Sequence, residues 1–379
     1  MHEYADVIVI GAGTTGTSAA WHLARAGASV RLLDKGAIAS GSSGASPGIV
    51  REYYADPALS QLAARGVRAY RDWRQHYPGT CGYQRTGFLT GIPAREQAAT
   101  QANVEHLRAT GAALEWLSAE QMQAQVPDLI IDGLAGAVFE PDAGYCDPRL
   151  TARSFAAGAR DLGAVIDEGR AARRIVRQAG RAIGVQTDTG FIACAHVVNA
   201  AGPWAATLAD DCQAPLPIHA TRQSVGIVQV EGVDSPMPGY CDREAGFYLR
   251  PDQPGSYFIG SLMAAEGVPI DPDSFDRSFC DANVLAYRDR AALRLKRLTG
   301  ARATGRRVSF FDNTPDGNPI VGPDPRVPGL FVAAGLCGHG FKFAPLFGQA
   351  IAQWVLQGEM PAQMGVFAVE RFLGSVQST

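Results

Sequence analysis

The stretch that most constrains the fold is DVIVIGAGTTGTSAAWHLARAGASVRLLDKG, residues 6–36. Residues 6–10 form the apolar run expected of a parallel strand covered on both faces. Three glycines follow with the spacing GxGxxG: Gly11, Gly13 and Gly16. Small and apolar residues then recur at helical period until Gly27, and a second apolar run, residues 29–33, ends at Asp34. The pattern predicts a strand, a glycine turn, a helix and a second strand.

This unit is typical of a dinucleotide site. Its glycines allow a tight turn and close approach of the backbone to a pyrophosphate, while the helix N-terminus supplies free N–H groups. Asp34 follows Gly16 by eighteen residues, where a carboxylate is expected to meet ribose hydroxyls. We expect Thr15 and Lys35 to contribute to the same site. The unit does not show whether the cofactor is NAD or FAD.

The next segment favours a flavin. A nicotinamide enzyme would continue with further strand and helix repeats, whereas residues 39–54 read ASGSSGASPGIVREYY, a polar loop rich in glycine and serine. Such a loop, with Ser42 and Ser43, can bind phosphates and pass under a large flat ring. Two later segments, residues 195–209 and 329–358, again combine an apolar strand, a glycine loop and a helix. They imply one nucleotide domain that another domain interrupts.

The expected fold is therefore α/β. We expect a discontinuous Rossmann-like FAD-binding domain formed by residues 1–80, 145–215 and 308–379. Residues 81–144 and 216–307 contain β-type runs broken by proline and glycine, which predicts an α+β substrate domain with a large antiparallel sheet.

Three segments resemble one enzyme family most specifically: GSSGASPGIVR (41–51), NTPDGNPIVG (313–322) and GHGFKFAP (338–345). With the first glycine unit, they resemble the FAD-dependent D-amino-acid oxidase family, and within it the sarcosine oxidase and glycine oxidase type of amine oxidoreductase. The resemblance spans essentially the whole chain. It implies oxidation of the Cα–N bond of an amino acid.

The flavin site implied by the resemblance is drawn from the later loops. Its further members are Ala171, Ala201, Gly202, Trp204, Gly335, Gly338, Gly340, Phe341 and Lys342. A helix that begins at GHGFKFAP can stabilise the negative charge of a reduced flavin with its N-terminus. Some sarcosine oxidases attach the flavin to a cysteine where this chain has Ser309, so we expect noncovalent FAD.

The resemblance also implies how a substrate carboxylate is held. Arg51 and Lys342 occupy the positions that bind it in the sarcosine oxidase group, and a buried carboxylate needs such compensation. Glycine oxidases use an arginine where this chain has Phe310 and Phe311, so we expect the sarcosine oxidase mode. His339 is either a flavin neighbour and proton carrier or an ordinary loop histidine.

The resemblance places two tyrosines, Tyr54 and Tyr248, near the substrate. Period-two alternation puts Tyr248 and Arg250 on the same face of a strand, although this pattern also fits a half-buried strand without a role in binding. Sarcosine oxidases have a lysine over the flavin that assists the reaction with oxygen. The resemblance aligns Phe258 with that lysine. Reoxidation by O₂ to give H₂O₂ and electron transfer to another acceptor both stay open. Apolar residues at 258–263 indicate room for a substrate larger than sarcosine.

The composition of the chain indicates which kinds of binding partner to expect. A formal net charge of -3 in 379 residues gives no electrostatic case for nucleic acid or for an anionic membrane, so a small amino acid with a carboxylate is expected. Seven scattered cysteines without a CxxC pair argue against a disulfide framework and a zinc site. Without an apolar run long enough to span a membrane, the expected location is the cytoplasm.

The expected reaction starts with hydride transfer from a secondary amine to the flavin and ends with hydrolysis of the imine. The secondary amine is an N-substituted glycine or a cyclic imino acid. The alternatives are an oxidase of glycine or a D-amino acid, a dehydrogenase, a flavoprotein subunit that depends on a partner, and an NAD-dependent dehydrogenase.

Overall fold

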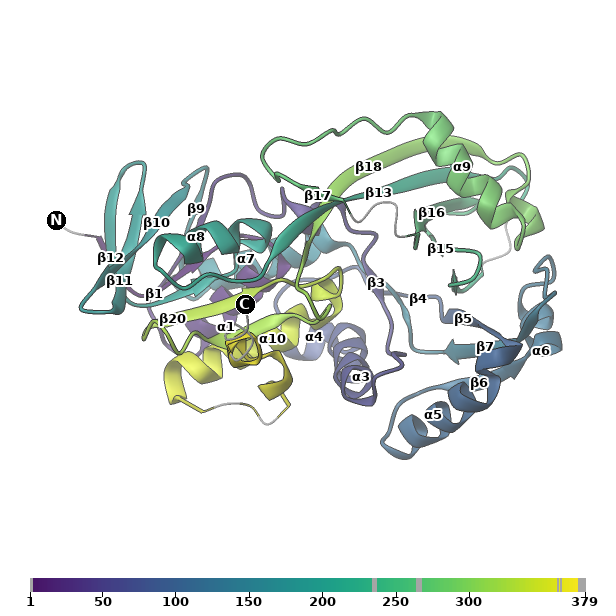
Figure 1. Ribbon diagram of the computed structural model, residues 1–379, viewed down its shortest axis with the longest axis horizontal. Coiled ribbons are helices and arrows are strands. Elements are labelled where there is room, and N and C mark those ends of the chain that lie inside the picture. The colour runs from purple at the N-terminus through teal and green to yellow at the C-terminus, as the bar shows by residue number, and fades with distance from the viewer. Residues whose placement is uncertain (1–2, 234–236, 264–267, 360, 362, 374–379) are drawn as a thin grey trace, which may run out of the picture.

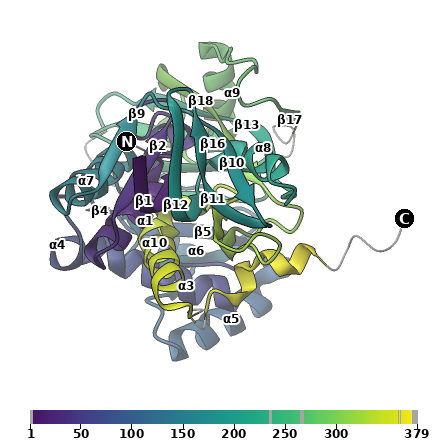
Figure 2. The ribbon, with the colours of Figure 1, turned by 90° about the vertical axis from the view of Figure 1, so that its left-hand side faces the viewer.

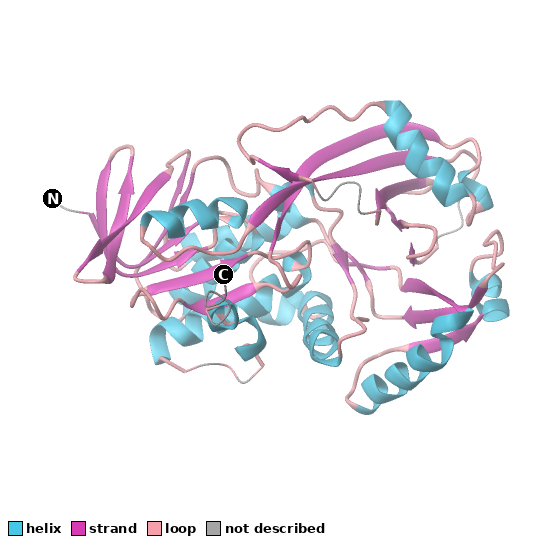
Figure 3. Cartoon of the chain, in the orientation of Figure 1, coloured by secondary structure: helices cyan, strands magenta, loops and turns pink. Residues whose placement is uncertain are grey.

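The computed structural model describes residues 3–233, 237–263, 268–359, 361 and 363–373. Two large β-sheets and one small sheet organise the chain. In Figure 1 the sheet that contains β1 lies on the left, and the sheet that contains β13 and β18 lies on the right. Figure 3 shows that helices accompany both large sheets.

The first sheet has eight strands and a parallel centre. In spatial order its strands are β10 (Ala172–Gln178), β11 (Arg181–Thr187), β12 (Gly190–Asn199), β1 (Glu3–Ile10), β2 (Val30–Asp34) and β9 (Val165–Glu168), with β20 (Leu330–Ala334) on β12 and β19 (Ile320–Pro323) on β20. β1 pairs in parallel with β2 and β12, and β12 pairs in parallel with β20. Figure 2 views the molecule from this end. The predicted Rossmann-like sheet is confirmed.

Helices on both faces explain the apolar sequence of β1. Val7 and Val9 pack against one set of helices, whereas Ile8 and Ile10 pack on the opposite face. The first set comprises α1 (Thr14–Arg25), α3 (Pro57–Arg71), α4 (Trp73–His76), α7 (Pro148–Asp161) and α10 (Gly340–Gln357), and α8 (Ala205–Asp211) covers the other face. A strand covered on both faces needs an uninterrupted apolar run.

α10 packs closely on α1 and contains a proline. A Cβ at Gly348 would lie 2.2 Å from Ser18 Oγ on α1, so the glycine permits this contact. Pro345, predicted near the first turn, lies in the second turn and has no N–H for the carbonyl of Phe341. Tyr70 Oη donates to that carbonyl at 2.6 Å, which replaces the missing helical bond.

The second large sheet has nine strands and is antiparallel except where β14 pairs with β5. In spatial order its strands are β17 (Pro269–Ile270), β13 (His219–Gln229), β16 (Ser256–Ser261), β15 (Phe247–Pro251), β14 (Gly239–Asp242), β5 (Phe88–Pro93), β7 (Leu134–Glu140) and β6 (Glu115–Ser118), with β18 (Arg302–Asn313) on β13. Three helices accompany it: α5 (Gln97–Ala109), α6 (Ala119–Gln125) and α9 (Asp281–Ala292). The predicted large antiparallel sheet, and with it the α/β fold class, is confirmed.

The small sheet joins segments that lie between the two large ones. Its strands are β3 (Ile49–Val50), β8 (Gly144–Tyr145) and β4 (Gln84–Arg85). The predicted loop at 39–54 therefore contains β3, and also the short helix α2 (Ser42–Ala45). The predicted domain boundary between residues 307 and 308 falls within β18, and the division into domains stays a prediction.

Short 3-10 helices complete the described secondary structure. They are Ala94–Glu96, Gly202–Trp204, Lys296–Leu298, Gly365–Phe367 and Val369–Phe372. Within the described part of the chain, no helix combines the length and apolar character that crossing a membrane requires.

Candidate active site

Most residues predicted to bind the cofactor lie at one edge of the first sheet. They follow the carboxyl ends of β1, β2, β9, β12 and β20, which run parallel to one another. The groups are Gly11, Gly13, Thr15 and Gly16 after β1, Asp34 and Lys35 at the end of β2, Ala171 after β9, Ala201, Gly202 and Trp204 after β12, and Gly335, Gly338, Gly340, Phe341 and Lys342 after β20. Open α/β sheets bind ligands at this edge.

The glycine turn after β1 has no room for larger side chains. A Cβ at Gly11 would lie 2.3 Å from Ala200 O, and a Cβ at Gly16 would lie 1.9 Å from Gly11 O. Gly11 also has a φ of 103°, which residues with a Cβ rarely adopt. At the end of β2, the carboxylate of Asp34 is fixed because it accepts the N–H of Ala12 at 2.6 Å.

The glycine loop between β20 and α10 is equally crowded. A Cβ at Gly338 would lie 2.7 Å from the ring of Phe311, and a Cβ at Gly340 would lie 2.4 Å from Leu336. Gly335 and Gly338 have φ values of 63° and 73°. Because these glycines have no side chain, the loop fits into this space, and the N-terminus of α10 lies at the same sheet edge as the N-terminus of α1.

Lys35 and Trp204 form a cluster with an aspartate from the second half of the chain. Lys35 Nζ lies 3.6 Å from the centre of the Trp204 ring. Both side chains donate to Asp273, Lys35 at 2.5 Å and Trp204 Nε1 at 2.9 Å. The cluster links the segment after β17 to the edge where the cofactor residues meet.

The polar loop that contains the predicted Ser42 and Ser43 is held from several sides. Ser43 Oγ accepts the N–H of Thr14 at 3.1 Å. Three arginines donate to carbonyl groups of the loop: Arg149 Nε to Gly44 at 3.1 Å, Arg307 Nη1 to Ser46 at 3.2 Å and Arg250 Nε to Pro47 at 2.6 Å. Arg250 also pairs with Asp252 at 2.9 Å. It therefore holds the loop.

The predicted carboxylate-binding residues converge on Tyr54. Lys342 Nζ donates to Tyr54 Oη at 2.7 Å, and the same oxygen lies 2.9 Å from His339 Nδ1. The guanidinium carbon of Arg51 lies 4.9 Å from the centre of the Tyr54 ring. Tyr54 Oη therefore accepts from Lys342 Nζ and also contacts a ring nitrogen of His339, whose tautomer sets the direction of that second bond.

Burial and neighbouring cations perturb the pKa values of this cluster. Burial, followed by Lys342 and Arg51, lowers the pKa of His339 to about 3. Burial and then Arg51 lower the pKa of Lys342 well below its usual value, while Glu140 opposes this change. Burial raises the pKa of Tyr54 to about 12, although Arg51 opposes it. A carboxylate between the two cations would raise the pKa of Lys342 again.

The second sheet covers this cluster. Phe88 and Cys241 form a buried group against which Tyr248 packs, and the guanidinium of Arg51 lies 5.8 Å from the Phe88 ring centre. A Cβ at Gly260 would lie 2.3 Å from Tyr248 Cζ, so the Tyr248 ring lies across Gly260 on the neighbouring strand. Tyr248 thus belongs to the cover over Arg51, while Arg250 is turned to the loop.

One carboxylate near the site was not predicted. Glu140, the last residue of β7, is fully buried and accepts the N–H groups of Glu52 and Tyr53. A single glutamate at the end of an apolar strand has no sequence spacing that would mark it as a site residue. The loop-holding Arg149 and Arg307 were missed for the same reason.

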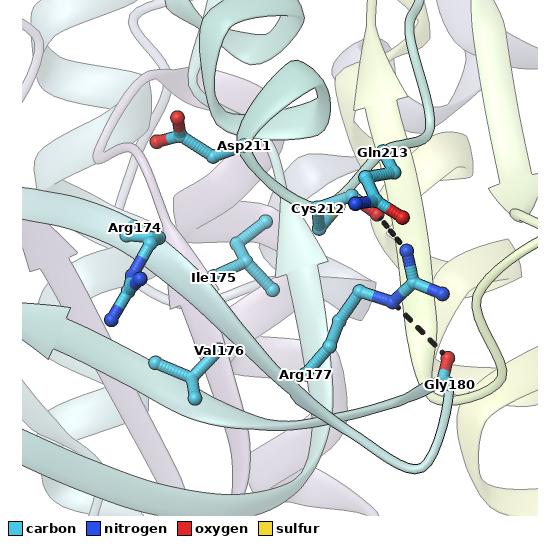
Figure 4. A pocket seen from close by; sticks show the side chains of 8 residues that line it. All are labelled: Arg174, Ile175, Val176, Arg177, Gly180, Asp211, Cys212 and Gln213. Atoms are coloured by element: carbon cyan, nitrogen blue, oxygen red, sulfur yellow. Dashed lines mark hydrogen bonds between the residues drawn. The ribbon is translucent and has the colours of Figure 1, made fainter.

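A separate surface pocket lies between β10, the turn that follows β10, and the C-terminal end of α8 (Figure 4). Its lining residues are Arg174, Ile175, Val176, Arg177, Gly180, Asp211, Cys212 and Gln213. Arg177 already donates to the carbonyls of Cys212 and Gly180. The pocket contains no predicted site residue.

The family described as FAD dependent oxidoreductase matches residues 6–354, and the chain belongs to this family. The predicted FAD-dependent oxidoreductase class and its cofactor, FAD, are thereby confirmed.

Two curated relatives extend over nearly all of this chain. It is 28% identical over 382 residues to the 4-methylaminobutanoate oxidase (formaldehyde-forming) of Paenarthrobacter nicotinovorans, covering 97% of this chain and 45% of the relative. It is 26% identical over 392 residues to the mitochondrial sarcosine dehydrogenase of Homo sapiens, covering 97% of this chain and 41% of the relative. The chain spans less than half the length of both.

Two solved structures share the fold. The L-proline dehydrogenase from P. horikoshii has a TM-score of 0.90 and 24% identity, with 99% of each chain covered. The glycine oxidase from Geobacillus kaustophilus has a TM-score of 0.84 and 24% identity, with 97% of this chain and 99% of that chain covered.

The residues at the sheet edge fit FAD. Helix α1 begins at Thr14 after the N-cap residue Gly13, which has no side chain to cap it. Ser43 Oγ accepts the N–H of Thr14, and the following N–H groups of the first turn can receive a pyrophosphate. Thr15 Oγ1, beside them, is buried and has no hydrogen-bond partner among the described residues. The fixed carboxylate of Asp34 suits a ribose.

Proposed function

We propose that the chain oxidises the Cα–N bond of a small amino acid that is a secondary amine, such as an N-substituted glycine or a cyclic imino acid. The observation that carries the proposal is the convergence of two cations, Arg51 and Lys342, on buried Tyr54. An arginine fork with a second cation compensates a buried carboxylate. The substrates in the names of three similar proteins, 4-methylaminobutanoate, sarcosine and proline, each combine a secondary amine with a carboxylate.

Positioning is the main contribution of the protein in this proposal. FAD, when bound, supplies the acceptor for the hydride that leaves the carbon next to nitrogen. Arg51 and Lys342 hold the carboxylate and thereby fix the α-carbon. Tyr54 holds Lys342 Nζ through the 2.7 Å bond. Tyr248 and Phe88 cover the site and limit access of water.

We propose that FAD is held without a covalent bond. The glycine turn, Asp34 and the two glycine loops supply its contacts, and residue 309 on β18 is a serine, which cannot form the thioether of a cysteine. A spectrum of the released cofactor after denaturation and filtration tests this point. FAD that stays with the polypeptide would contradict it.

The electron acceptor is O₂ or another oxidant. Phe258 stands where sarcosine oxidases have the lysine that assists the reaction with oxygen. The centre of its ring lies 4.1 Å from the guanidinium carbon of Arg250 and 4.6 Å from that of Arg307. Peroxide formation in air would support an oxidase. A flavin that stays reduced in air would support a dehydrogenase, or a subunit that needs a partner.

The test is to replace each cation by methionine. Arg51→Met and Lys342→Met should each lower kcat/KM by about 30-fold to several thousandfold, because a buried carboxylate loses a charged partner, while FAD content stays unchanged. Arg68→Met and Lys296→Met are matched controls at exposed positions and should behave like wild type. Full activity with unchanged KM in either site variant would refute the carboxylate assignment.

A further inference from the structure

Glu140 links the second sheet to the segment that carries Arg51. Its side chain is 0% exposed. Oε2 accepts the N–H of Tyr53 at 2.9 Å and also the N–H of Glu52. Oε1 has no hydrogen-bond partner within the described part of the chain. One carboxylate oxygen therefore binds two successive N–H groups, and the other is buried without a partner.

The register of the sheet brings Glu140 to this place. Glu140 pairs with Phe88 across β5 and β7, and paired residues in a sheet lie on the same face. That face covers Arg51, whose guanidinium lies 5.8 Å from the Phe88 ring centre.

The segment held by Glu140 has no regular structure of its own. Residues 51–54 lie between β3 and α3 and pair with no strand. Their N–H groups at 52 and 53 would otherwise be buried without partners, which is unfavourable. The residues on either side of the two N–H groups are Arg51 and Tyr54, the two side chains of this segment in the proposed substrate site.

Stability alone does not explain a carboxylate here. Burying a charged group with an unpartnered oxygen costs free energy, and burial accordingly raises the pKa of Glu140, although Arg51 opposes this. A side chain selected only for packing would avoid that cost.

We propose that Glu140 is a positioning residue for substrate binding, which fixes the backbone between Arg51 and Tyr54 so that both side chains meet the substrate carboxylate. The inference rests on the proposed function. The positioning role depends on the length of the Glu140 side chain, because this length determines where the carboxylate holds the two N–H groups.

Two substitutions of Glu140 separate the effect of its side-chain length from the effect of its charge. Glu140→Gln keeps the length and one acceptor oxygen but loses the charge. Glu140→Asp keeps the charge but withdraws the acceptor by about 1.5 Å. Acetate is the binding probe, and its Kd is obtained from the change it causes in the flavin absorption spectrum of the FAD-loaded protein.

The expected result is an acetate Kd within about threefold of wild type for Glu140→Gln and a Kd at least about tenfold higher for Glu140→Asp, because two buried N–H groups lose their partner. Equal Kd values in the two variants, or weaker binding in Glu140→Gln than in Glu140→Asp, would overturn the inference. If Glu140→Asp does not fold, Glu140→Gln alone decides, and a tenfold loss in that variant overturns the inference.

Glu52→Asp is the matched control. Glu52 is also buried and lies in the same segment, but its Oε2 accepts the N–H of Ala113 at 3.3 Å, outside the Arg51 cluster. Its shortening should leave the acetate Kd unchanged, and an equal loss would show general loosening of the segment and overturn the inference.

Arg51→Met, measured in the same series, distinguishes a failure of the proposed function from a failure of the inference about Glu140. If Arg51→Met binds acetate as wild type does, the proposed function has failed. If Arg51→Met loses acetate while Glu140→Asp does not, only the inference about Glu140 has failed.

Discussion

Glu52 provides a quantitative test of how burial shapes the segment beside the site. Its side chain is 2% exposed, and burial, followed by the charge of Glu140, raises the pKa from 4.5 to about 7. At 1.36 kcal/mol per pKa unit, this shift corresponds to about 3 kcal/mol. Between about pH 4.5 and 7 the folded state keeps a proton that the unfolded state has released, so stability falls as the pH rises through this window.

Glu52→Gln removes that proton linkage. The variant should gain stability relative to wild type by up to about 3 kcal/mol as the pH rises from about 4.5 to 8. Urea unfolding of FAD-saturated protein at several pH values measures this difference, and Glu105→Gln, at an exposed position on α5, is the control. A difference between variant and wild type that does not change with pH would refute the reasoning.

Two further substitutions test other contacts. Tyr70→Phe removes the side-chain donor to the Phe341 carbonyl, which Pro345 cannot serve, and it should lower the free energy of unfolding by about 1–3 kcal/mol; an unchanged urea midpoint would contradict this role. Gly260→Ala places a Cβ 2.3 Å from the Tyr248 ring, so the ring must move. KM for the substrate should change several-fold with FAD content retained, and wild-type KM would show that the Tyr248 ring does not border the substrate.

The fold was largely predictable because its signals are local. The spacing of Gly11, Gly13 and Gly16, followed by Asp34, encodes a strand, a turn and a helix within one short segment. The sequence also indicated that Arg51 and Lys342 act together, through the family resemblance.

Contacts between distant segments were not predictable. Glu140 meets the N–H groups of residues 52 and 53 across 88 and 87 positions in the chain, respectively, and no periodicity marks such a pair. The same holds for Arg307, which reaches the carbonyl of Ser46 from β18. Tyr54 was expected near the substrate, but only the structure places its hydroxyl between Lys342 and His339.

The most direct test of the central claim is an anaerobic titration of the FAD-loaded chain. Sarcosine, longer N-alkylglycines, proline and glycine are added in turn while the visible flavin absorption is recorded, and air is then admitted. The account predicts that at least one secondary amine with a carboxylate bleaches the flavin, and does so faster than glycine. A flavin that none of these secondary amines reduces, or that glycine alone reduces, would contradict it.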